Sequence, residues 1–226
     1  MPARPNRRTA FWLTLMLAAA AVATAAALLQ WVGLHRASKP LVMLFAIIFV
    51  AGRADLAGAD GRFRWLLMAA LACSMAGDAL LMFDGLFLPG LVAFLLAHLA
   101  YLALFARGLP WLPSRAATLL VALLGVGMYA FLWQGGRPAG LRVPVALYVL
   151  AIGLMVAQAV GRATRLRDGP AWRVALGAGL FMLSDSLLAT NRFVQPLPLA
   201  PLWVLGSYFI AQILIAACAR PASARG

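Results

Sequence analysis

Two aspartates, Asp78 and Asp185, are the most unusual residues of this 226-residue chain, because each lies inside a long apolar run. The chain has six acidic residues, all of them aspartates, and the other four lie in connections or at the ends of apolar runs. A carboxyl group within a membrane is costly unless it is paired or hydrated, so it normally faces a bundle interior and serves a function. The alternative is a protonated aspartate that only ties two helices together.

These two aspartates occupy corresponding places in an internal repeat. A shift of 107 positions, without a gap, pairs four kinds of scarce residue: Asp78 with Asp185, Trp65 with Trp172, Pro89 with Pro196, and Tyr101 with Tyr208. The coincidence indicates two related halves. Each aspartate lies 13 residues after its tryptophan, which is about 20 Å along a helix, so we expect both carboxyl groups at one depth.

Two carboxyl groups at one depth can divide acid and base work, one donating a proton and the other accepting one. The same pair would serve a proton-coupled transporter, so the pair alone leaves both function classes open. His98 could complete an acid, base or metal site with them, or could be satisfied inside the bundle. A metal centre is disfavoured, because zinc sites use three or four ligands at definite spacing.

Further polar residues share helical faces with these candidates. Tyr101 follows His98 by three positions, and Gln212 follows Tyr208 by four, so each pair lies on one face of its helix. These side chains either complete the site or make ordinary hydrogen bonds between helices.

Lys39 is the only lysine among 19 basic residues, and it precedes Pro40. We expect it at the outer start of the second apolar run. There it is either a solvated charge at a helix end or a contact to a phosphate group.

The elements that must position these residues are membrane-spanning helices. With 65% hydrophobic and 11% charged residues, the chain has too little polar surface for a water-soluble protein. We predict a single all-α membrane domain with a basic tail over residues 1–9 and half-repeats over about 10–110 and 111–220. Apolar runs predict eight spans, over residues 10–33, 40–52, 65–83, 86–106, 115–133, 143–160, 171–190 and 199–219.

The second span is short, at 13 residues. A helix needs about 20 residues to cross a bilayer. We therefore expect this segment to be tilted, partly re-entrant or extended into residues 51–61.

The basic residues predict the topology. The net charge of +13 comes from arginines between apolar runs, not from a basic face with interleaved aromatic residues, so we expect no nucleic-acid partner. With the N-terminus inside, cytoplasmic segments hold 14 of the 19 basic residues and the opposite side holds 5. Positive residues are retained in the cytoplasm, so we expect both termini there, in a bacterial plasma membrane. An even number of spans per half makes the halves parallel repeats.

Six short motifs occur in order: Ser-Met-Ala-Gly-Asp-Ala-Leu-Leu around Asp78, Ala-His-Leu-Ala-Tyr ending at Tyr101, Pro-x-x-x-Tyr ending at Tyr148, Gly-Ala-Gly-Leu-Phe-Met-Leu-Ser-Asp-Ser-Leu-Leu around Asp185, Asn-Arg-Phe from Asn191, and Tyr-x-x-x-Gln from Tyr208. With Lys39-Pro40, they resemble the YhhN family of eight-span membrane proteins over about residues 40–220. Characterised members are lysoplasmalogenases, which hydrolyse the vinyl ether of alkenyl lysophospholipids to a fatty aldehyde and glycerophosphoethanolamine or glycerophosphocholine.

The resemblance implies that activity here, and Asp78 and Asp185 can serve as its acid and base in either order, with no cofactor or metal expected. The expected partners are a lysophospholipid substrate and membrane lipid, and the phosphate is expected near Lys39 or Arg192. The oligomeric state stays open. A proton-coupled transporter or a lipid-binding protein of the same fold is the alternative. Substrate-binding or supporting roles are expected for Lys39, Ser74, His98, Tyr101, Tyr148, Ser184, Asn191, Tyr208 and Gln212.

Overall fold

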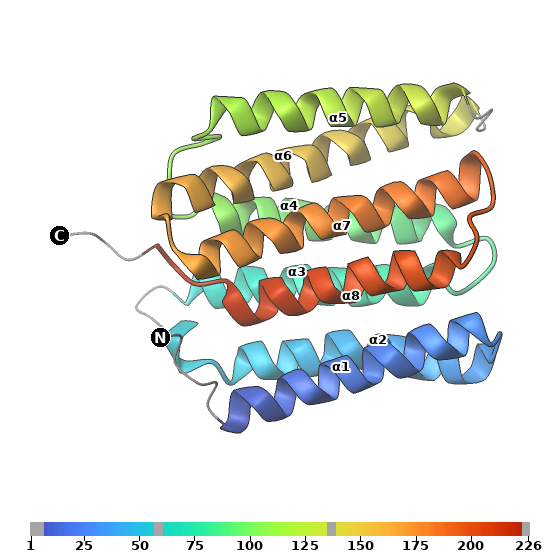
Figure 1. Ribbon diagram of the computed structural model, residues 1–226, viewed down its shortest axis with the longest axis horizontal. Coiled ribbons are helices and arrows are strands. Elements are labelled where there is room, and N and C mark those ends of the chain that lie inside the picture. The colour runs from blue at the N-terminus through green and yellow to red at the C-terminus, as the bar shows by residue number, and fades with distance from the viewer. Residues whose placement is uncertain (1–6, 57–60, 135–138, 223–226) are drawn as a thin grey trace.

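The computed structural model describes residues 7–56, 61–134 and 139–222, and every regular element in these ranges is helical (Figure 1). Eight of the helices are long and apolar enough to cross a membrane, which confirms the predicted number of spans. Two short 3-10 turns, η1 (Ala54–Leu56) and η2 (Ala139–Leu141), lie in connections. The long helices are α1 (Arg7–Leu28), α2 (Val32–Ala51), α3 (Arg62–Leu80), α4 (Phe87–Ala106), α5 (Arg115–Gln134), α6 (Arg142–Leu166), α7 (Gly169–Phe193) and α8 (Ala200–Cys218).

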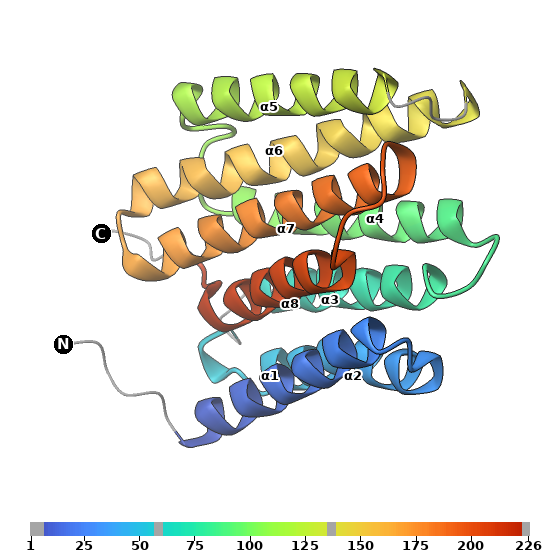
Figure 2. The same cartoon turned by 45° about the vertical axis from the view of Figure 1, so that its right-hand side comes forward.

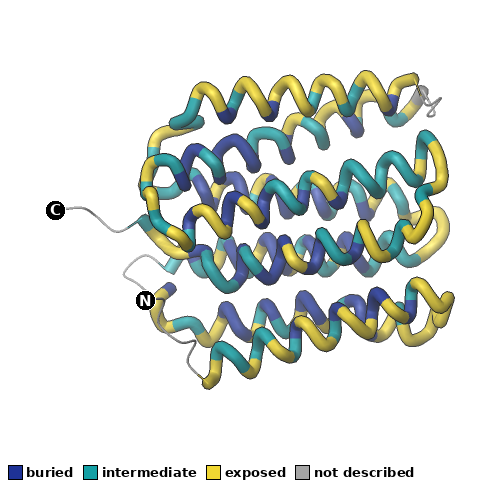
Figure 3. The backbone as a smooth tube through the Cα atoms, viewed as in Figure 1, coloured by how far each residue is buried: buried dark blue, intermediate teal, exposed yellow. Residues whose placement is uncertain are grey.

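The helices form two packed layers (Figures 1 and 2). One layer contains α1, α8 and α7, and the other contains α2, α3 and α4. Helix α6 packs against both α4 and α7 and closes one end of the layers, while α5 lies outside and packs mainly on α6. Figure 3 shows the consequence: buried residues follow the inner faces of the layers, and α5 is largely exposed.

Aromatic rings fill the space between the layers at the level of the aspartates. Phe181 of α7 meets Phe94 of α4 and Tyr208 of α8 edge to face, with ring centroids 6.1 and 5.3 Å apart. Phe94 and Tyr208 are in turn 5.9 Å apart. Such edge-to-face contacts add to the area that the rings bury. Three helices are therefore fixed relative to one another where the carboxyl groups lie.

Local signals set the helices that carry the aspartates. The side chain of Asp168 accepts a hydrogen bond from the Ala171 amide at 2.7 Å and caps α7, and Pro170 lies in the first turn. Both are favourable at a helix N-terminus. On α3, a Cβ at Gly77 would lie 2.6 Å from Phe94. Gly77 therefore permits the close approach of α3 and α4 beside Asp78.

The second span differs from the sequence prediction. Helix α2 begins at Val32 and has 20 residues, because α1 ends at Leu28 instead of residue 33. Pro40 lies inside α2, which membrane helices tolerate, and Lys39 beside it is buried. The helix is thus longer at its start than predicted. The expected extension into residues 51–61 is wrong for the described residues up to 56, because α2 ends at Ala51. Residues 57–60 lie outside the described part.

The two predicted halves correspond to α1–α4 and α5–α8, and consecutive helices pack together in each. They differ in their further contacts: α1 also packs on α8 from the other half, whereas α5 lies at the edge. Helix α1 begins and α8 ends at the same end of the bundle (Figure 1). The repeat and the side of the membrane stay predictions.

Candidate active site

Asp185 receives polar groups from two other helices. The Tyr148 hydroxyl of α6 donates a hydrogen bond to Asp185 Oδ2 at 2.5 Å, and His98 Nε2 of α4 lies 3.5 Å from the same oxygen. The His98 ring is fully buried between Tyr148 and Phe181, with centroids 5.0 and 4.7 Å away. Among the described residues, neither of its ring nitrogens has a hydrogen-bond partner. The carboxylate therefore has one strong donor, one neighbouring imidazole and room for another polar contact.

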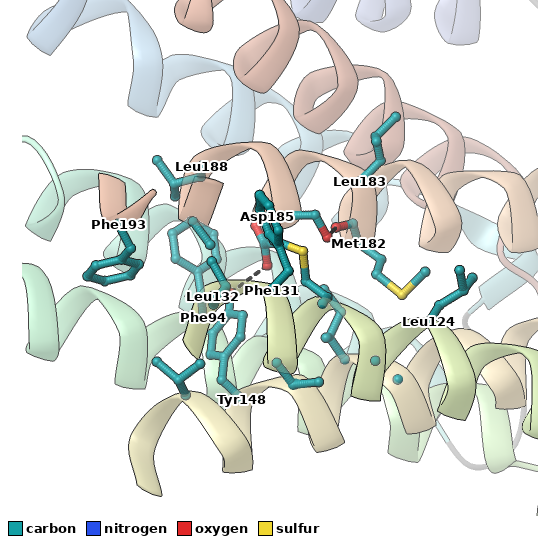
Figure 4. A pocket seen from close by; sticks show the side chains of 18 of the residues that line it. Phe94, Leu124, Phe131, Leu132, Tyr148, Met182, Leu183, Asp185, Leu188 and Phe193 are labelled. Atoms are coloured by element: carbon teal, nitrogen blue, oxygen red, sulfur yellow. Dashed lines mark hydrogen bonds between the residues drawn. The ribbon is translucent and has the colours of Figure 1, made fainter. Parts of the chain in front are cut away.

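A cavity of about 550 Å³ opens beside Asp185, which is within the range of small-molecule sites. Asp185 and Tyr148 point toward one another on its wall, among Phe94, Leu132 and Met182 (Figure 4). Most of the wall is apolar and comes from α4, α5, α6 and α7. The polar side chains of the described lining are those of Tyr148, Asp185, Ser186 and Arg192. The cavity can therefore hold a largely apolar molecule against a carboxyl group.

Asp78 has a different environment. Its Oδ1 lies 3.1 Å from Lys39 Nζ of α2, and its Oδ2 accepts a hydrogen bond from the Tyr208 hydroxyl of α8 at 2.7 Å. The residue is 1% exposed and does not belong to the cavity wall. Both oxygens are thus occupied, and one of them carries a cation.

The aromatic group of Phe94, Phe181 and Tyr208 lies between the two carboxyl sites. Tyr208 bonds Asp78, and Phe181 touches His98, which neighbours Asp185. The aromatic layer therefore lies between the two aspartates, and only Asp185 lines the cavity.

Lys39 does not lie at the helix end where the sequence predicted it. It is neither a solvated charge at a helix end nor part of the cavity, because it lies within α2, is 8% exposed and pairs with Asp78. A lone lysine beside a proline resembles a helix boundary. The ion pair with Asp78 on α3 compensates for the desolvation of the buried ammonium group.

A second polar network lies next to Asp78. Tyr101 of α4 donates to Gln212 Oε1 of α8 at 2.5 Å, and Gln212 Nε2 donates to Ser74 Oγ of α3 at 3.0 Å. All three residues are fully buried. Tyr101 and Gln212 do point inward on the faces that they share with His98 and Tyr208, and the two hydrogen bonds together join α3, α4 and α8.

Two further candidates tie backbone segments together instead of lining the cavity. Ser184 Oγ donates to the Val204 carbonyl at 2.9 Å and links α7 to α8. Asn191 Oδ1 accepts from the Leu197 amide at 2.8 Å and shapes the connection between these helices. Both residues support the geometry of α7 on either side of Asp185.

Sequence reasoning missed Ser186 and the wall that α5 supplies. Ser186 lies on the cavity although its hydroxyl donates to the Met182 carbonyl of its own helix. The α5 wall carries no polar residue, and its only signals were Gly125 and Gly127, which also fit helix packing. Within the described ranges, no three His, Cys, Asp or Glu residues come together as a metal site would require. The site thus offers a carboxyl group, a phenol and an imidazole.

Comparison with known proteins places the chain. Residues 34–219 match the YhhN family. Lysoplasmalogenase TMEM86B of Sus scrofa is 38% identical over 186 residues, which are 82% of this chain and 74% of that protein. Lysoplasmalogenase TMEM86B of Homo sapiens is 35% identical over 175 residues, 77% of this chain and 72% of that protein.

A lysoplasmalogenase of Mycobacterium bovis is 35% identical over 166 residues, 70% of this chain and 61% of that protein. No solved structure matches the chain. The family match spans α2 to α8, so it contains both aspartates and every helix that lines the cavity. The chain belongs to the YhhN family.

Proposed function

We propose that this protein is an integral membrane hydrolase that cleaves the vinyl ether bond of alkenyl lysophospholipids. The observation that carries the proposal is the position of Asp185, which lies beside Tyr148 on the wall of a 550 Å³ apolar cavity. An amphiphile with one hydrocarbon chain suits such a wall. Similarity to lysoplasmalogenases over most of the chain supports the same substrate class.

Vinyl ether hydrolysis needs one acid and one water molecule. Protonation of the β-carbon gives an oxocarbenium ion, water adds to the α-carbon, and loss of a proton gives a hemiacetal. The hemiacetal then collapses to a fatty aldehyde and the glycerophospho-alcohol. A carboxyl group can donate the first proton, stabilise the cation as carboxylate and then accept the proton from water, as carboxyl groups do in glycosidases.

We assign the proton transfers to Asp185, because it faces the cavity. The Tyr148 hydroxyl orients its carboxyl group by a hydrogen bond, and the His98 ring lies next to it. Asp78 is the second carboxyl group of the proposed site and acts as a positioning residue: its contacts with Lys39 and Tyr208 join α2, α3 and α8 behind the aromatic layer. The hydrogen bonds among Ser74, Tyr101 and Gln212 hold the helices around Asp78. Ser184 and Asn191 hold α7, which carries Asp185.

A transporter of this fold is the competing function. Transporters commonly break their helices where the substrate binds, whereas α3 and α7 run without interruption through Asp78 and Asp185. This continuity favours a fixed catalytic site over alternating access.

The purified protein in detergent tests the proposal directly. We expect free aldehyde from a 1-alkenyl lysophospholipid and none from the matched 1-alkyl lysophospholipid, because a saturated ether has no double bond to protonate. Protein-free micelles control for spontaneous hydrolysis. Absence of aldehyde from the alkenyl lipid, or uptake of intact lipid into proteoliposomes without hydrolysis, would refute the enzyme and favour transport or lipid binding.

We also propose a plasma-membrane location with both termini in the cytoplasm, from the 14 to 5 distribution of basic residues. Reporter fusions at Gly226 and within residues 135–140 should report opposite sides of the membrane. Equal signals from both fusions would contradict this topology.

A further inference from the structure

The charged groups of the cavity are separated along α7. Asp185 and Arg192 both line the cavity and are seven residues apart, so they lie on one face of the helix, about 10 Å apart along its axis. Arg192 is the only basic residue of the described lining and belongs to the last turn of α7. The cavity thus has a cation at one end and a carboxyl group further in.

Aromatic rings hold the Arg192 guanidinium at this end. Its Cζ lies 5.4 Å from the centre of the Phe87 ring. Phe87 meets Phe193 edge to face, with centroids 5.5 Å apart, and both rings line the cavity. A guanidinium over an aromatic face keeps its donors free for an anion, and its planar fork suits a phosphate group.

On the other side of Asp185 the wall is apolar and includes several glycines. Gly179 lies six residues before Asp185 on α7, about 9 Å along the axis. Gly125 of α5 and Gly153 of α6 also line the cavity. Apart from its chain neighbours and the backbone of its own helix, no heavy atom of the described residues lies within 4 Å of the position that a Cβ at Gly179 would take. This part of the described lining carries no polar side chain. The space therefore suits a hydrocarbon chain.

The spacing matches the proposed substrate class. In a 1-alkenyl lysophospholipid, seven bonds separate the phosphorus atom from the vinyl β-carbon, which is about 8 Å at the ~1.2 Å per bond of an extended chain. A phosphate held by the Arg192 guanidinium therefore brings the double bond to Asp185. Of the two cations expected near the phosphate, Lys39 is already paired with Asp78.

We infer that the lysolipid lies lengthwise along α7, with its phosphate at Arg192, its vinyl ether at Asp185 and its hydrocarbon chain directed toward Gly179. Arg192 then determines specificity for phosphate-bearing ethers, and Gly179 leaves room for the chain. This inference rests on the proposed function, so its tests compare substrates and variants within an active protein.

The first test removes the guanidinium and the phosphate in turn. With a 1-alkenyl-glycerophosphoethanolamine, we expect Arg192→Gln to raise KM at least ~10-fold with kcat near wild type, since the contact persists from ground state to transition state. With a 1-alkenyl-glycerol, which lacks phosphate, the same variant should behave as wild type. Arg192→Lys should keep part of the preference for the phosphate-bearing substrate. Arg142→Gln is the matched control, because Arg142 stacks on Trp133 and does not line the cavity.

The second test shortens the chain slot. Gly179→Leu should reduce hydrolysis of a 16-carbon alkenyl lipid at least ~10-fold and leave an 8-carbon alkenyl lipid nearly unaffected. The 9 Å section between Asp185 and Gly179 holds only about seven bonds. Gly206→Leu on α8 is the control, because Gly206 also has open space around its Cβ position but lies outside the cavity wall.

The outcomes separate the orientation from the function. If wild type releases no aldehyde from any alkenyl lipid, the proposed function fails. If wild type is active but Arg192→Gln changes both head-group classes equally, or neither, the phosphate does not lie at Arg192. If Gly179→Leu slows short and long chains alike while the detergent-solubilised variant stays monodisperse, or slows neither, the chain does not extend toward Gly179.

Discussion

Asp78 and Asp185 occupy matching positions in their helices and have opposite surroundings. Asp78 is almost fully buried, carries Lys39 on one oxygen and Tyr208 on the other, and lies away from the cavity. Asp185 borders the cavity, accepts from one phenol and has no cation among its described contacts. A carboxylate locked to an ammonium has no free proton site, whereas one beside an open cavity can exchange a proton with a substrate. The neighbours, not the residue type or the depth, decide which aspartate is available for chemistry.

The largest expected effect follows from removing the available carboxyl group. Asp185→Asn keeps the size and hydrogen-bonding capacity of the side chain but cannot transfer a proton, so aldehyde release should fall at least ~100-fold. The fold should survive, because an amide is less costly to bury than a charge. Asp84→Asn makes the same chemical change at an exposed position and should keep full activity. Near-normal aldehyde release from a monodisperse Asp185→Asn protein would end its assignment as the acid.

The paired aspartate should respond differently. Asp78→Asn leaves the Lys39 ammonium buried without its partner, which costs about 3–5 kcal/mol, so thermal unfolding in detergent should shift to lower temperature. Because Asp78 is a positioning residue, Asp78→Asn should also lower aldehyde release. Combining it with Lys39→Met removes both charges and should restore most of the stability and of the aldehyde release. If the double variant regains its unfolding temperature but stays inactive, Asp78 takes part in the chemistry as the second carboxyl group.

The two phenols extend the comparison. Tyr148→Phe removes the donor to Asp185 and should lower kcat about 10-fold with little change in unfolding temperature, because the adjoining cavity accommodates the freed carboxyl group. Tyr208→Phe removes the donor to Asp78, where the contact is buried and structural, and should cost roughly 1 kcal/mol of unfolding free energy. Kinetics and thermal unfolding of both variants under one condition distinguish the roles. Equal effects on kcat would remove the distinction.

The smallest effect is expected at Asp55, an aspartate outside the membrane-spanning helices. Arg53 hydrogen-bonds Asp55 at 2.6 and 3.2 Å and lowers the pKa of that carboxyl below its ordinary value of 3.8. A lowered pKa stabilises the fold above the unfolded-state pKa, and the contribution disappears as pH falls through the folded-state value. The Asp55 side chain is 56% exposed, so Asp55→Asn should cost less than about 1 kcal/mol at pH 7. The difference from wild type should shrink as the pH is lowered from 7 through the folded-state pKa, and a difference that does not depend on pH would contradict the ion-pair origin.

Periodicity and composition were sufficient for the helices and for the inward position of the aspartates. They were insufficient wherever a property depends on which helices meet. Lys39 next to Pro40 has the local pattern of a helix end, and only Asp78 on another helix makes its burial possible. Likewise, the spacing of Tyr101 from His98 and of Gln212 from Tyr208 predicted shared helical faces, but not the hydrogen bond between Tyr101 and Gln212. The α5 wall could not be recognised, because its two glycines also fit helix packing and apolar residues facing a cavity look the same in sequence as those facing lipid.

The apolar wall of the cavity has a kinetic consequence for any substrate that dissolves in the bilayer. Nearly all residues of that wall belong to membrane-spanning helices, so the protein samples its substrate within a two-dimensional phase. The governing variable is then the mole fraction of substrate among the surrounding amphiphiles, not its molarity in the buffer. Diluting mixed micelles with inert detergent at constant total substrate should therefore slow the reaction, whereas diluting the whole suspension with buffer should leave the turnover per protein molecule unchanged.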